Sequence, residues 1–151
     1  MDATCGECGA ALPASGACID RFHALLAAEV DNPELRGVHG LTVMTYYLQH
    51  PSLCKPWYLD WGREVMRRIF AHGEPWSSVL LEEHPRVVGR QQSAAALAVR
   101  KAAGGTEMPS WVVTQPVAGE LTIISVDTAA EHGPAAQVED WARSVAEHRF
   151  L

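Results

Sequence analysis

One predicted helix constrains the fold of this chain more than any other stretch. Residues 38–51 read VHGLTVMTYYLQHP, and the helix they predict runs from about residue 35 to residue 50, because Pro51 disfavours its continuation. At ~100° per residue, His39 and His50 lie within ~20° of one another on the same face. They are also ~16 Å apart along the axis, whereas zinc–nitrogen bonds are ~2 Å. One zinc ion therefore cannot bind both.

A zinc-knuckle motif stands near the start of the chain. In Cys5-Gly6-Glu7-Cys8-Gly9 the two-residue spacer lets both thiolates reach one tetrahedral ion, and glycine permits the left-handed turn that this requires. Two cysteines are half of a site. The residues that could complete it are Cys18, His23, His39, His50 and Cys54.

A helical hairpin selects among these residues. The apolar spacing after Cys18 predicts a helix up to residue 30, and Asp31-Asn32-Pro33 ends it. If this helix and the 35–50 helix are antiparallel about that turn, Cys18 faces His50 and Glu29 faces His39. The predicted site is then a Cys3His zinc centre; a shift of one turn would replace His50 by Cys54. Its predicted ligands are Cys5, Cys8, Cys18 and His50.

A second group of residues suggests acid–base chemistry. Glu29 could orient or charge His39 across the hairpin, and Tyr46 falls on the same helix face. These three are the candidate catalytic residues, although a histidine on an apolar helix face is more often a hydrogen-bonded core residue. An enzyme could also use a zinc ion with an open coordination position. Alternatively, Cys5 and Cys8 could form a redox pair.

The remainder of the chain is expected to be a single, mainly α-helical domain. Residues 1–16 form the knuckle and 17–104 a helical bundle, with helices predicted at 57–73, 76–83 and 93–105 and a loop at 84–92. The β-branched residues near 122–126 predict a small late β hairpin within 110–128. A final helix is predicted over 134–149.

Composition and missing motifs exclude several functions. The net charge of −6, with no clustered basic stretch, argues against nucleic-acid binding. No apolar run reaches the ~18–20 residues that span a membrane, and no secretory signal is visible, so we expect a cytoplasmic protein. HExxH, Walker, GxGxxG and GxSxG motifs are absent.

Several of these motifs together resemble a bacterial family known only as a domain of unknown function. The matching stretches are 5–10 (CGECGA), Cys18, 25–29 (LLAAE), 38–51, and a closing set of Glu131, His132, Val138, Trp141, Ala142, Ser144 and Val145. The resemblance is weak over 52–118, and Ala146 stands where the family tends to have tryptophan. It implies no activity, but it implies that Cys5, Cys8, Cys18, His39, His50 and His132 are pattern positions.

The sequence thus predicts a small zinc-binding helical protein that acts by binding a protein partner or a small molecule. Whether it is an enzyme stays open.

Overall fold

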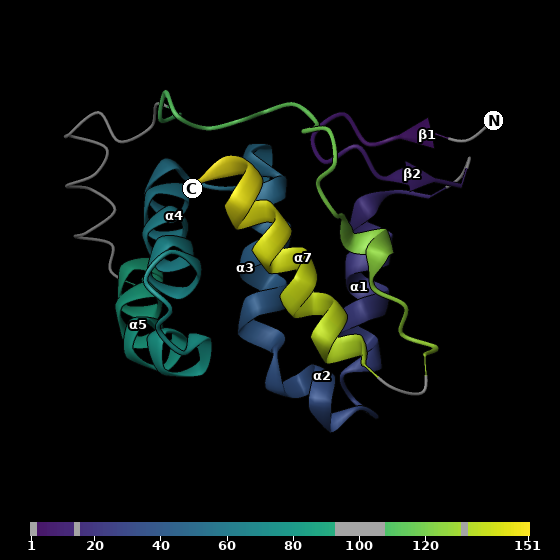
Figure 1. Ribbon diagram of the computed structural model, residues 1–151, viewed down its shortest axis with the longest axis horizontal. Helices are drawn as coiled ribbons and strands as arrows, with labels where there is room; N and C mark the ends of the chain where they lie inside the picture. Colours follow the sequence, from purple (N-terminus) through teal and green to yellow (C-terminus); the bar gives the residue numbers. More distant parts are fainter. Residues whose placement is uncertain (1–2, 14–15, 93–107, 131–132) are drawn as a thin grey trace.

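The computed structural model describes residues 3–13, 16–92, 108–130 and 133–151. Within them the protein is mainly α-helical, as predicted (Figure 1). The helices are α1 (Cys18–Ala28), α2 (Pro33–Gly37), α3 (His39–Gln49), α4 (Pro56–Phe70), α5 (Trp76–Gln92) and α7 (Pro134–Arg149), with short 3-10 helices η1 (Pro51–Leu53) and η2 (Ile123–Ser125). Strands β1 (Ala3–Thr4) and β2 (Ala11–Leu12) form an antiparallel pair at the N-terminal end.

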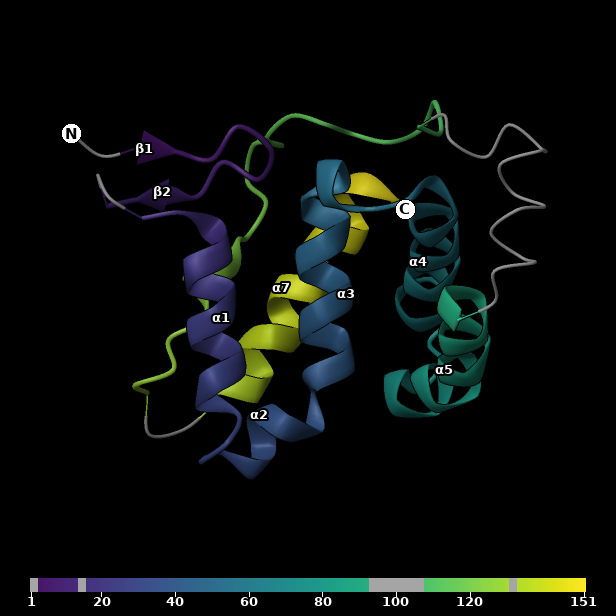
Figure 2. The same ribbon diagram turned by 180° about the vertical axis from the view of Figure 1, so that it is seen from behind.

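The helical hairpin forms, but its second arm is broken. The expected continuous helix over 35–50 is wrong at its start, because α2 and α3 meet at Val38, whose φ of −105° and ψ of 14° are not helical. Gly37 and Gly40 flank this break, and glycine has low helix propensity. Asn32 caps α2 by accepting hydrogen bonds from two backbone N–H groups. Figure 2 shows α2 turned across the ends of α1 and α3.

Helix α7 is central to the packing of the bundle. It contacts α2, α3 and α4, and its residues Val138, Trp141, Ala142 and Val145 are fully buried at the i, i+3, i+4, i+7 spacing of one helix face. Helices α3 and α4 also pack closely at Gly62. A Cβ atom at that position would lie 2.7 Å from Leu48 Cδ2, so a larger residue there would have to displace this buried side chain.

Segment 108–130 contains no strand in the structure, so the predicted hairpin over 110–128 is wrong. Residues 123–125 form η2 instead, and the segment crosses the end of the bundle (Figure 1). Its backbone bonds to side chains rather than to another strand: Leu121 N–H donates to Ser144 Oγ, and Leu121 C=O accepts from Gln49 Nε2. These partners satisfy the polar groups that a β ladder would otherwise pair.

Four other predictions concern the chain after residue 56. The loop expected at 84–92 is wrong, because α5 continues through Pro85 to Gln92. Proline removes one helical hydrogen bond and is usually a helix boundary, which is why the sequence indicated an end there. The helices expected near 57–73 and over 134–149 are present as α4 and α7. The helix expected at 93–105 lies outside the described residues.

None of the helices that the structure describes combines the length and the apolar character needed to cross a membrane.

Candidate metal centre

The N-terminal residues fold into a tight knuckle. Cys5 N–H donates to the carbonyl of Ala10 and Gly9 N–H donates to the carbonyl of Cys5, each over 2.9 Å. Gly9 has φ of 80°, the left-handed conformation that favours glycine. The N–H of Ala10 lies 3.5 Å from Cys8 Sγ, so the backbone supplies a hydrogen bond to that sulfur. The loop thus holds the sulfur atoms of Cys5 and Cys8 close to each other.

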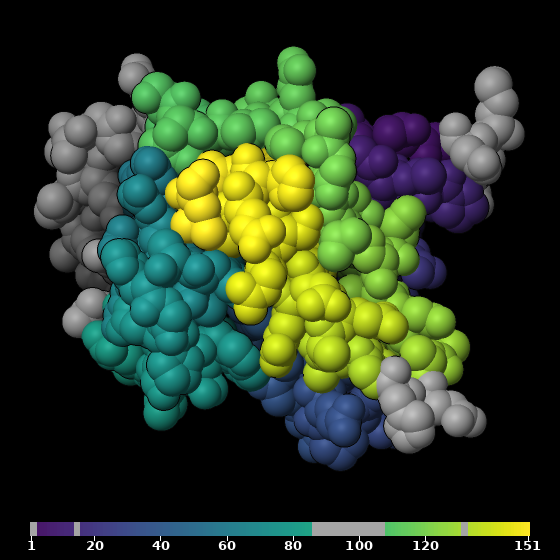
Figure 3. Space-filling view, viewed as in Figure 1, coloured from purple at the N-terminus to yellow at the C-terminus, as the bar shows by residue number. Residues whose placement is uncertain are grey.

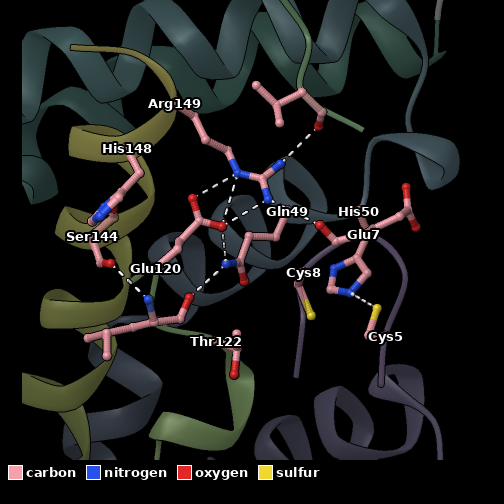
Figure 4. Close-up of polar contacts among 12 residues, drawn as sticks. Cys5, Glu7, Cys8, Gln49, His50, Glu120, Thr122, Ser144, His148 and Arg149 are labelled. Atoms are coloured by element: carbon pink, nitrogen blue, oxygen red, sulfur yellow. Dashed lines mark hydrogen bonds and ion pairs between the residues drawn. The ribbon is translucent and has the colours of Figure 1, made fainter. Parts of the chain in front are cut away.

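The hairpin brings two more ligands to the knuckle. Cys18 is the first residue of α1, and His50 directly follows the last residue of α3. The candidate ligand atoms of Cys5, Cys8, Cys18 and His50 all lie within 4.8 Å of one another. Cys8, Cys18 and His50 are buried, and Cys5 is half-buried. The four residues predicted as ligands are therefore brought together; Figure 4 shows three of them, with His50 directed at Cys5.

Two distances in this group match a tetrahedral zinc site. Cys8 Sγ and Cys18 Sγ are 3.6 Å apart, and Cys5 Sγ and His50 Nε2 are also 3.6 Å apart. Zinc bonds of ~2.3 Å to sulfur and ~2.0–2.1 Å to nitrogen imply tetrahedral separations of ~3.8 Å and ~3.6 Å respectively. A disulfide would need ~2.05 Å, and all four cysteines are free. The group can hold one tetrahedral ion with little movement.

The ring of His50 is oriented for metal binding. Its Nδ1 lies 2.7 Å from the backbone carbonyl of Tyr46, which can only accept, so Nδ1 carries the hydrogen. In the neutral ring, Nε2 then keeps the lone pair that a metal requires. Tyr46 also stacks on His50 at a centroid distance of 4.3 Å, and Phe22 stacks on Tyr46 at 4.0 Å. Buried aromatic rings therefore fix the ligand's orientation.

The side chains of Cys8, Cys18 and His50 shift one another's pKa values. A hydrogen bond from Cys18 is the main reason that the pKa of Cys8 falls to about 4, despite burial. The same bond, together with burial, raises the pKa of Cys18. Burial lowers the pKa of His50, but hydrogen bonds with Cys8 and with the Tyr46 carbonyl outweigh it and raise that pKa to about 9. These directions favour a thiolate at Cys8, a thiol at Cys18 and an imidazolium at His50.

Comparison with known proteins identifies a family. The model of a family of unknown function, DUF5946, matches residues 3–149. The chain belongs to the DUF5946 family. The match includes residues 52–118, where the resemblance in the sequence motifs was weak. No curated protein and no solved structure matches the chain.

The other metal-ligand candidates of this DUF5946 protein lie outside the four-residue group. Cys54 Sγ donates to the carbonyl of Tyr47 over 3.3 Å, and burial raises its pKa to about 12. Because the group of converging ligand atoms contains His50 and not Cys54, the alternative register in which Cys54 replaces His50 is wrong. His23 is exposed on α1, and His39 is engaged by Glu29. His132, a pattern position, lies outside the described residues.

The predicted facing pair Glu29 and His39 does form. Glu29 Oε2 lies 2.7 Å from His39 Nδ1, with the Glu29 side chain 10% exposed and the His39 side chain 54% exposed. The other carboxylate oxygen, Oε1, is buried and lacks a hydrogen-bond partner among the described residues. Tyr46 is buried beside His50, about 10 Å further along the helix by its seven-residue offset from His39. The three candidate catalytic residues therefore do not form one group.

The sequence analysis missed a buried polar cluster next to the knuckle. Arg149 and Glu120 form an ion pair of 2.8 Å in which the side chains are only 1% and 0% exposed. Gln49 joins it, donating from Nε2 to Glu120 Oε1 over 2.6 Å (Figure 4). Gln49 Oε1 in turn accepts from Trp141 Nε1 over 2.8 Å. Charged residues scattered at positions 120 and 149 carried no pattern that would have predicted this burial.

Proposed function

We propose that Cys5, Cys8, Cys18 and His50 bind one zinc ion and that this ion is structural. The observation that supports the proposal most is the convergence of four ligand atoms within 4.8 Å of one another. Three thiolates and one imidazole favour zinc among the common metals. Four protein ligands also complete a tetrahedron, which leaves no coordination position for water or substrate, as in structural rather than catalytic zinc sites.

The proposed ion would fasten the N-terminal segment to the bundle. Strands β1 and β2 contain two residues each, and a hairpin of this size is not stable by itself in water. The ligands come from the knuckle, from the start of α1 and from the end of α3. One ion thus joins three segments, and its binding energy contributes directly to folding because the unfolded chain has no preformed site. The reducing cytoplasm, where we expect the protein, would keep the thiols available.

Metal content per chain tests this proposal. We expect one zinc per wild-type chain by elemental analysis, lost in Cys8→Ser and His50→Ala but retained in His39→Ala. His39→Ala is the matched control, because it makes the same substitution at the other end of α3. Wild-type protein that takes up no zinc, or a His50→Ala variant with a full complement of equal affinity, would refute the proposed ligand set.

With a structural ion, the activity of the protein would depend on its surface. We propose that it binds a protein partner or a small molecule at the Glu29–His39 edge, the part of the surface formed by these two side chains. An exposed imidazole held at 2.7 Å by a buried carboxylate is the arrangement that orients a histidine for proton transfer. Among the described residues, Oε1 of Glu29 has no hydrogen-bond partner, so a buried acceptor lies at the same place.

This edge gives a second candidate function, acid–base catalysis. A panel of chromogenic esters and phosphoesters can be screened with the wild type and with Glu29→Gln and His39→Gln. If the pair is catalytic, hydrolysis found in the wild type is lost in both variants while zinc content is unchanged. Hydrolysis that persists in both variants, or none in the wild type across the panel, argues against catalysis by this pair and leaves binding as the role of the edge.

A further inference from the structure

We infer that Arg149 and Glu7 are positioning residues for the metal site, so that the C-terminal end of α7 controls how tightly the knuckle holds its ion. The inference deepens the proposed zinc function and rests on it. It concerns Glu7, which stands between the two knuckle cysteines, and the buried cluster of Arg149, Glu120 and Gln49. Neither Glu7 nor Arg149 is a metal ligand.

Arg149 reaches the knuckle from the far end of the chain. Its guanidinium donates from Nε to both oxygens of Glu120, at 3.0 and 2.9 Å, and from Nη1 to the carbonyl of Val113. Its Nη2 donates to Glu120 and also, over 3.3 Å, to the backbone carbonyl of Glu7. Because Glu7 lies between Cys5 and Cys8, this last bond holds the loop that carries both thiolates. Figure 4 shows Arg149 in this bridging position.

The side chain of Glu7 holds the same loop from the other direction. Glu7 Oε1 accepts from the backbone N–H of Ser52 over 3.0 Å, and Oε2 accepts from Ser52 Oγ over 2.9 Å. Ser52 lies in η1, two residues after His50. A two-bond contact thus joins the knuckle to the turn that follows the histidine ligand. It fixes the position of the thiolates relative to His50 Nε2.

The buried cluster also contacts the end of α3, next to the histidine ligand. Gln49, immediately before His50, donates to Glu120 over 2.6 Å and to the carbonyl of Leu121 over 2.7 Å. The Arg149–Glu120 pair therefore contacts both the thiolate loop and the end of α3. Segment 108–130 lies against the knuckle, and Figure 3 shows the N-terminal segment beside it. A Cβ on Gly9 would lie 3.0 Å from Pro116 Cβ, so the knuckle and this segment are packed against each other there.

A guanidinium suits this role better than an ammonium. Its planar fork presents five donors in fixed directions, which allows one side chain to bond a carboxylate and two backbone carbonyls at once. Lysine would keep the charge beside Glu120 but would lose the simultaneous contacts to Val113 and Glu7. Loss of contacts that orient metal ligands typically weakens metal binding by about 10–100-fold.

The test is the rate at which zinc passes from the folded protein to a colorimetric chelator. We expect Arg149→Lys and Glu7→Ala each to release zinc about 10-fold faster than the wild type, or more. Arg143→Lys is the matched control for the first variant, because Arg143 is an exposed residue of the same helix whose guanidinium lies over the Phe70 ring. Glu34→Ala, at an exposed position in α2, is the control for the second.

A spectroscopic measurement separates positioning from general destabilisation. With cobalt in place of zinc, the visible absorption bands report the ligand geometry. We expect the bands to change in Glu7→Ala and Arg149→Lys, and to stay unchanged in Val138→Ala, which destabilises α7 by a core cavity away from the site. Unchanged bands and wild-type release rates in Glu7→Ala would overturn the inference even if Arg149→Lys failed to fold. A wild type that binds no zinc would instead refute the proposed function itself.

Discussion

The protonation of the metal-free site makes zinc affinity depend on pH in a definite way. His50, with a pKa of about 9, and Cys18, with a raised pKa, both carry a proton between pH 6 and pH 8. Cys8, with a pKa of about 4, carries none. Zinc requires a neutral imidazole and thiolates, so binding in this range must release at least the two protons of His50 and Cys18. Affinity therefore rises with pH.

The size of this effect follows from the number of protons. Each displaced proton changes the binding constant about 10-fold per pH unit, so two protons give about 100-fold per unit, or about 10,000-fold between pH 6 and pH 8. Above pH 9 the free protein has already lost the His50 proton, so the dependence becomes weaker by one proton. The affinity is measured by competition with a chelator of known affinity at each pH. Titration calorimetry in buffers of different ionisation enthalpy gives the proton count independently.

Two variants make this measurement decisive. His39→Ala should release the same number of protons as the wild type. His50→Ala, which we expect to lose its zinc in elemental analysis, should release one proton fewer for each zinc that it still binds at saturating zinc concentration. A wild type that releases no proton, or only one, for each zinc bound would refute the reasoning. Equal counts in the wild type and His50→Ala would show that His50 is not the protonated ligand.

Three further predictions concern stability. Removing zinc with a chelator should lower the melting temperature by about 8–16 °C. An ion at ~1,000 times its Kd contributes ~4 kcal/mol, and each kcal/mol corresponds to ~2–4 °C at this chain length. An unchanged transition in calorimetry would contradict a structural ion. Gly62→Ala should cost about 1 kcal/mol in urea unfolding with zinc retained, because its Cβ would meet the buried Leu48 at 2.7 Å. The ~1–3 kcal/mol of overpacking exceeds the ~1 kcal/mol that alanine gains in helix propensity inside α4. Trp141→Phe should cost about 1–3 kcal/mol in the same assay, because it leaves the buried Oε1 of Gln49 without its donor. Wild-type stability in Gly62→Ala or in Trp141→Phe would refute the contact that the variant was made to test.

The sequence by itself determined the candidate metal centre. The spacing of Cys5 and Cys8 with a following glycine is a local signal, and the knuckle forms from residues close together in the chain. The short turn at residues 31–33 then fixed the register of the helical hairpin. Because both arms start from this turn, Cys18 had to lie near His50, and Glu29 near His39, even though the second arm is broken at Val38.

Only the tertiary structure decided how this centre is supported. Residues 122–126 have the composition of a strand, yet segment 108–130 contains no strand, and its backbone bonds instead to side chains of α3 and α7. Arg149 and Glu120 look in sequence like surface charges, but both are buried where distant segments meet. Helix periodicity and motif spacing act over a few residues, whereas the burial of a charge depends on which segments pack together. The ligands were therefore readable from the chain, and the residues that hold them in position were not.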